Sequence, residues 1–170
     1  MVTEIRKSVI SGLLISIGGS VYICCSMAGL GWLGAVLFTL GLYTIIEYGF
    51  SLFTGKVGYI AYELRDVKYM GLVAFVLLFN LLATFAVGAL MSLAFAEMAA
   101  KASEIYAAKL AQPLFRAFLS AVFCGIIMFV AVDTGKRGSR LGMFLGIPTF
   151  IMFGFDHSIA NSFYNGLALG

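Results

Sequence analysis

The chain has 170 residues, of which 62% are hydrophobic and 11% are charged, and its mean hydropathy is +1.04. A soluble domain of this size has too much surface for its volume to hide so many apolar side chains. The net charge of +3 is small and lies in the connections between apolar segments, which argues against a nucleic-acid partner. The composition therefore predicts an all-α, polytopic protein of the lipid bilayer.

Five apolar segments follow one another along the chain. They cover residues 9–28, 33–62, 70–95, 115–132 and 141–169. A simple spanning helix needs about 20 apolar residues, and the second and fifth segments are longer than that. Small and polar residues interrupt both of them, which predicts two broken spans.

The segments group into one membrane domain, residues 1–170, with two parts. Residues 1–95 are predicted to form a first repeat of three spans, and residues 113–170 an incomplete second repeat. Residues 96–112 are polar and rich in alanine, which favours an external amphipathic helix between the repeats. Pro113 suits the start of the helix that follows.

Lysine and arginine are distributed unequally between the two sides of the predicted spans. Seven lie on one side, namely Arg6, Lys7, Arg65, Lys68, Lys136, Arg137 and Arg140. Three lie on the other side, namely Lys101, Lys109 and Arg116. Because cytoplasmic connections carry the excess of positive residues, we expect the N-terminus in the cytoplasm, in a plasma or bacterial inner membrane.

The three cysteines lie inside apolar segments, at positions 24, 25 and 124. Their spacing matches no zinc or redox motif, so we expect neither a metal nor a cofactor.

The fifth segment contains the only histidine of the chain, His157, directly after Asp156. A side chain that titrates near neutral pH at membrane depth is a candidate for function. The alternative is a histidine that only hydrogen-bonds a neighbouring helix.

The breaks in the second and fifth segments cover residues 49–56 and 154–162. They are three spans apart, so their segments cross the membrane in opposite directions. Broken helices at matching positions of two inverted halves indicate a transport site near the membrane midplane. Half-helix N-termini there favour an anion.

Both breaks carry recognisable motifs. Residues 51–56, SLFTGK, resemble the LFTGN signature of the formate/nitrite transporter family, and residues 154–161, GFDHSIAN, resemble its second signature, GFEHSIAN. The order of spans agrees as well, so the resemblance covers essentially the whole chain. It implies an inverted-repeat, aquaporin-like path in each protomer of a homo-pentamer. It also implies transport of small weak-acid anions such as formate, nitrite, hydrosulfide or lactate, often coupled to a proton.

The resemblance also assigns residues to the path. The family's central histidine is His157, facing Thr54 of the first break. Its apolar constrictions fall on Phe38 and Leu42 on one side and on Phe150 on the other.

Three further assignments come from the resemblance. The electropositive vestibule lysine of the family falls on Lys109. The acid before the histidine is Asp156, shortened from glutamate, and Asn161 ends the second signature. Lys109 is equally well explained as an ordinary solvated charge on an amphipathic helix.

The chain departs from the family pattern in four places. Ser51 stands where the family has an acid, for which Glu47 is a candidate substitute one turn earlier on the same helical face. Lys56 replaces the asparagine of LFTGN, and Gly125 replaces a polar residue of the fourth span. The family has six spans where this sequence has five. We therefore expect a fragment, a shortened form, or a partner that supplies the missing wall.

Other functions fit less well. An intramembrane hydrolase using Asp156, His157 and Ser158 is disfavoured, because adjacent residues on one backbone rarely converge on one atom of a substrate. We therefore expect no enzyme. A neutral-solute channel of the aquaporin type needs paired Asn-Pro-Ala motifs, which the sequence lacks. A non-transporting membrane scaffold remains open, and packing alone also accounts for the apolar residues of the path.

Overall fold

The computed structural model describes residues 1–170 and contains α-helices, one 3-10 helix and no strand. The seven α-helices are α1 (Val2–Met27), α2 (Gly31–Glu47), α3 (Val67–Ser92), α4 (Ala96–Leu110), α5 (Leu114–Lys136), α6 (Leu141–Met152) and α7 (Ser158–Leu169). The 3-10 helix is η1 (Val57–Ala61). The predicted all-α class is confirmed.

Three helices, α1, α3 and α5, are long and apolar enough to cross a membrane as single rods. At about 1.5 Å per residue, a helix of 23 to 26 residues exceeds the thickness of the hydrocarbon core, about 30 Å. The other two predicted spans are divided. One consists of α2 and η1, the other of α6 and α7, and α2 and α6 are shorter apolar helices. That these two segments cross the membrane stays a prediction.

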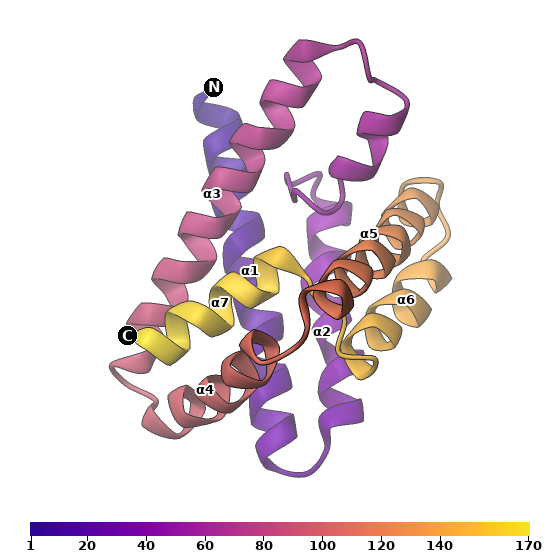
Figure 1. Ribbon diagram of the computed structural model, residues 1–170. Helices are drawn as coiled ribbons and strands as arrows, with labels where there is room; N and C mark the ends of the chain where they lie inside the picture. Colours follow the sequence, from indigo (N-terminus) through magenta and orange to yellow (C-terminus); the bar gives the residue numbers. More distant parts are fainter.

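The helices pack around α1 and α7. α1 contacts both α2 and α3, α5 pairs with α6, and α7 lies along α3 with α4 beside it (Figure 1). The two interrupted segments bring their irregular stretches to the middle of this arrangement. α4 occupies the stretch predicted to be an amphipathic helix, and α5 starts directly after Pro113.

α3 and α7 approach so closely that only glycine fits at their contact. A Cβ added at Gly88 would collide with the Phe163 carbonyl oxygen, and one added at Gly166 would collide with the Phe85 carbonyl oxygen. Small residues allow such backbone contact between membrane helices. The contact fixes α7, whose first turn directly follows His157.

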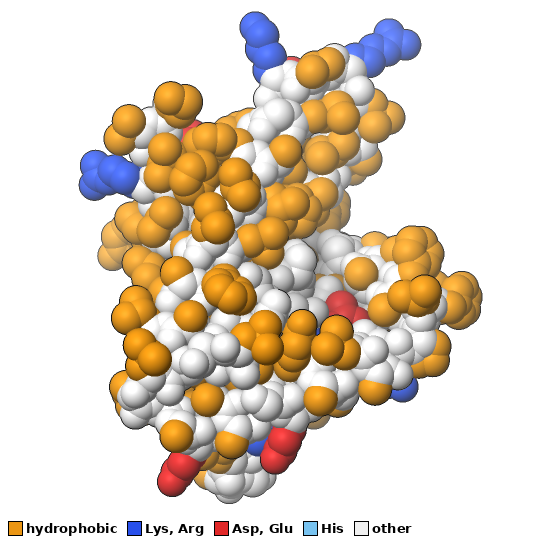
Figure 2. All heavy atoms as spheres, turned by 60° about the vertical axis from the view of Figure 1, so that its left-hand side comes forward, with side chains coloured by type: hydrophobic (Ala, Val, Ile, Leu, Met, Phe, Trp, Pro, Cys, Tyr) orange, Lys and Arg blue, Asp and Glu red, His pale blue; other side chains and the backbone are white.

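The outer surface is largely apolar. Figure 2 shows hydrophobic side chains over much of one face, with lysine and arginine side chains projecting at its upper edge. Large exposed apolar side chains occur on α1, α2, α3, α5 and α6, for example Ile17, Leu40, Leu82, Phe118 and Leu145. Such a surface is stable against lipid, whereas in water an exposed patch of this extent favours association.

Candidate functional site

The two breaks meet in the interior of the protein. Thr54 Oγ1 of the first break lies 3.1 Å from His157 Nε2 of the second, although the residues are 103 positions apart. Both side chains are buried. The tertiary structure therefore brings together the two signatures that the sequence separates.

His157 also begins α7. Its Nδ1 accepts a hydrogen bond from the Ala160 N–H at 3.1 Å, so the ring caps the first turn of the helix. A ring nitrogen that accepts carries no proton, so the neutral imidazole has its proton on Nε2 and donates it to Thr54 Oγ1. Protonation of Nδ1 would break the cap. The observed arrangement is thus a neutral histidine with its donor aimed at the first break.

Aromatic rings cover His157 on one side. The Phe150 ring stacks on the imidazole with a centroid distance of 5.3 Å, and Phe38 meets Phe150 edge-to-face at 6.3 Å. The sequence analysis grouped Phe38 with Leu42 and set Phe150 apart, which is wrong. Phe38 and Phe150 belong to one aromatic contact, because α2 and α6 pack side by side and turn these rings toward each other. Leu42, one turn further along α2, lines a different cavity.

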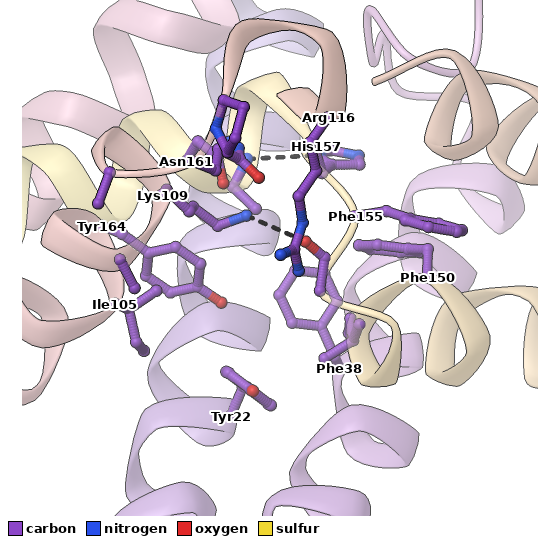
Figure 3. Close-up of a pocket in the computed structure, with 17 residues that line it drawn as sticks. Tyr22, Phe38, Ile105, Lys109, Arg116, Phe150, Phe155, His157, Asn161 and Tyr164 are labelled. Atoms are coloured by element: carbon purple, nitrogen blue, oxygen red, sulfur yellow. Dashed lines mark hydrogen bonds between the residues drawn. The ribbon is translucent and has the colours of Figure 1, made fainter. Parts of the chain in front are cut away.

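Two cavities lie along α2, and only the larger one touches this contact. The larger one, of about 530 Å³, is lined by the aromatic contact, by His157 and by polar side chains of α4, α5 and α7 (Figure 3). The smaller one, of about 150 Å³, is lined by Leu42, Gly55 and residues near the ends of α2 and α5. Gly55 lines the smaller cavity and His157 lines the larger one. The hydrogen bond between Thr54, the neighbour of Gly55, and His157 therefore joins the two segments that line the cavities.

Asp156 organises the polar wall of the larger cavity. Its carboxylate accepts hydrogen bonds from Lys109 Nζ at 2.7 Å, Gln112 Nε2 at 2.6 Å and Asn161 Nδ2 at 3.0 Å. Its backbone N–H donates to Ser120 Oγ at 2.9 Å. Lys109 therefore lines the cavity as one half of an ion pair with Asp156, and its role as a vestibule lysine stays a prediction.

Arg116 is the cation of this cavity that the sequence analysis did not single out. It lies near the start of α5, is exposed, and forms none of the ion pairs in the structure. In Figure 3 its side chain extends among the residues that line the cavity. The sequence could have pointed to Arg116, because it lies close to Lys109 in the segment between the third and fourth predicted spans.

Asn80 of α3 holds the first break in place. Its Oδ1 accepts from the Phe53 N–H at 2.8 Å, and its Nδ2 donates to the Ser8 carbonyl at 2.8 Å and to the Ser51 carbonyl at 3.1 Å. Ser51 in turn donates its hydroxyl to Glu4 Oε2 at 2.8 Å. These hydrogen bonds fix the backbone next to Thr54 and so position its side chain.

The proposed substitution of Glu47 for the missing acid is wrong. α2 ends at Glu47, and Gly49 has a left-handed φ of +64°, so Glu47 and Ser51 do not share a helical face. Glu47 forms an ion pair with Arg140 instead. The acid that reaches Ser51 is Glu4 of α1.

Comparisons with known proteins identify the family and the fold. A family model described as "Formate/nitrite transporter" matches residues 2–169. A solved structure described as "Pentameric formate channel with formate bound" has the same fold, with a TM-score of 0.75 and 24% sequence identity. The match covers 98% of this chain and 74% of that one. No curated protein matches the sequence. Since the family model spans nearly all of the chain, the protein is a membrane protein that belongs to the formate/nitrite transporter family.

Proposed function

We propose that the protein transports small monovalent weak-acid anions, such as formate, nitrite or hydrosulfide, and that a proton accompanies them. The observation that carries this proposal is the Thr54–His157 hydrogen bond, which joins the two segments that line the cavities. It gives a buried donor beside the aromatic contact of Phe38 with Phe150, where an entering anion loses water. Family membership supports anion transport in general.

The chemistry follows from the cost of dehydration. An ion that enters a low-dielectric passage loses hydration that apolar walls do not replace, whereas a neutral acid loses much less. Arg116 draws the anion into the larger cavity, and the contact of Phe38 with Phe150 opposes its further passage in charged form. Protonation next to His157 removes the charge. The proton comes from water, or from the imidazole once Nδ1 has gained a proton and released the Ala160 N–H, and the acid ionises again in the smaller cavity.

The assembly and the orientation belong to the same proposal. A homo-pentamer is supported by the similar fold of a channel described as pentameric. A cytoplasmic N-terminus, in a plasma or bacterial inner membrane, is supported by the excess of lysine and arginine on the side of the N-terminus. Two inverted parts, residues 1–95 and 113–170, would place the breaks at equivalent depths.

The test is uptake by liposomes that contain the purified chain, measured for formate, nitrite and hydrosulfide with and without an inward proton gradient. His157→Asn is the informative variant, because asparagine caps a helix well but does not titrate. We expect it to abolish the stimulation by the gradient and to leave at most a conductance. Ser158→Ala, at an exposed neighbouring position, is the matched control and should behave as the parent.

One outcome decides the source of the proton, and another would contradict the proposal. Gradient-stimulated uptake that is unchanged in His157→Asn would exclude an essential titrating role for the imidazole. No uptake at all by a folded and inserted parent chain would favour a membrane scaffold in place of a transporter.

A further inference from the structure

The smaller cavity contains two lysines that the path described above does not use. Lys56 from the first break and Lys136 from the end of α5 both line it, together with Leu42 and Gly55. Lys56 stands where the resembling signature has asparagine. This chain therefore has two lysines at the cavity, and the LFTGN signature has a neutral asparagine at the position of Lys56.

Neither lysine has a carboxylate partner in the structure. Asp133, one turn before the second lysine, accepts from the Tyr59 hydroxyl at 2.9 Å and from Arg137 Nε at 2.7 Å. Glu47, at the end of α2, forms its ion pair with Arg140. The acids on the elements around the cavity are thus engaged elsewhere, and two positive charges stay uncompensated.

Contacts with tyrosines fix both lysines near the cavity without neutralising them. Lys136 Nζ lies 4.3 Å from the centroid of the Tyr59 ring, a cation–π contact that leaves the ammonium charged. The Lys56 carbonyl accepts a hydrogen bond from the Tyr69 hydroxyl at 2.9 Å, which ties its backbone to α3. The Lys136 ammonium and the backbone of Lys56 are therefore held beside one small space.

We infer that Lys56 and Lys136 form a binding site for a small monovalent oxyanion at this end of the path. Two unpaired cations near a low-dielectric wall concentrate anions, and a cavity of about 150 Å³ has room for a small anion with a few waters. Leu42 continues the wall of this cavity along α2 toward Phe38. With Arg116 in the larger cavity, each end of the path then carries its own anion-attracting charge.

The inference extends the proposed function, but it is testable without any transport. Ile46→Cys places a thiol in the wall of the smaller cavity, in a chain whose native cysteines are replaced by alanine. The full chain is inserted into phosphatidylcholine vesicles, and the thiol is modified with an anionic and with a cationic methanethiosulfonate reagent. The ratio of the two rates reports the local potential.

We expect Lys56→Asn and Lys136→Gln each to lower this ratio several-fold. A unit charge about 7 Å away in water changes the concentration of a monovalent reagent about threefold, and the change applies in opposite directions to the two reagents. Added formate should slow the anionic reagent in the parent chain, and this protection should disappear when both lysines are replaced. Lys56→Arg keeps the charge and should keep the ratio.

Lys68→Gln is the matched control, because Lys68 is exposed and does not line this cavity. A ratio that responds equally to Lys68→Gln and Lys56→Asn, or to neither, would overturn the inference. Loss of formate protection when anionic phosphatidylglycerol is added would also overturn it, since a lipid phosphate would then be the ligand. Protection without any formate uptake would keep the site and remove the proposed transport function.

Discussion

Replacement of Asn80 by leucine tests whether one buried amide positions the first break. Leucine has a similar size and leaves no large cavity, so the change removes hydrogen bonds rather than packing. Three bonds disappear, to the Phe53 N–H and to the Ser8 and Ser51 carbonyls. All three cross from α3 to other parts of the chain, and two of them hold the break.

The expected loss of stability is about 3–5 kcal/mol. Hydrogen bonds between membrane helices contribute about 0.6 kcal/mol each on average, so three of them give about 2 kcal/mol. The Phe53 N–H loses its partner in an apolar setting, and a buried unpaired group costs about 1–3 kcal/mol. Thr54 follows Phe53, so its contact with His157 should loosen and uptake should fall with stability.

The measurement is denaturant unfolding of the purified chain in mixed micelles, followed by uptake in liposomes. Thr84→Val is the matched control. Thr84 is equally buried in α3, but its hydroxyl bonds only to carbonyls of its own helix, at Asn80 and Leu81. We expect it to cost less than about 1 kcal/mol. Equal costs for the two variants, or normal uptake in Asn80→Leu, would refute the positioning role.

Two other predictions concern the contacts around α7. Gly166→Val should destabilise the protein by at least about 2 kcal/mol, because the added Cβ would collide with the Phe85 carbonyl and force α7 away from α3. An unchanged melting temperature in detergent would count against this close approach. Asp156→Asn should cost about 1–2 kcal/mol, since the ion pair with Lys109 is only partly shielded from solvent. A double-mutant cycle with Lys109→Met should show coupling of about 1 kcal/mol, and strictly additive costs would contradict a pair at this site.

The sequence by itself determined the class of the protein. Mean hydropathy and the lengths of apolar segments depend only on composition along the chain, so the membrane class could be predicted without coordinates. The stretches around Thr54 and His157 carry local motifs, and the chain does leave helical geometry there. Of the second predicted break, residues 154–162, only residues 154–157 lie outside a helix, because α7 begins at Ser158. Family membership followed from the same two motifs.

Only the tertiary structure decided which side chains face one another. The sequence does not specify how each helix is rotated about its axis, and that rotation sets whether Phe38 meets Phe150 or Leu42. The sequence also does not show that Lys109 forms an ion pair with Asp156. Such pairings depend on helix contacts between residues tens of positions apart, and close glycine contacts such as the one at Gly166 fix them.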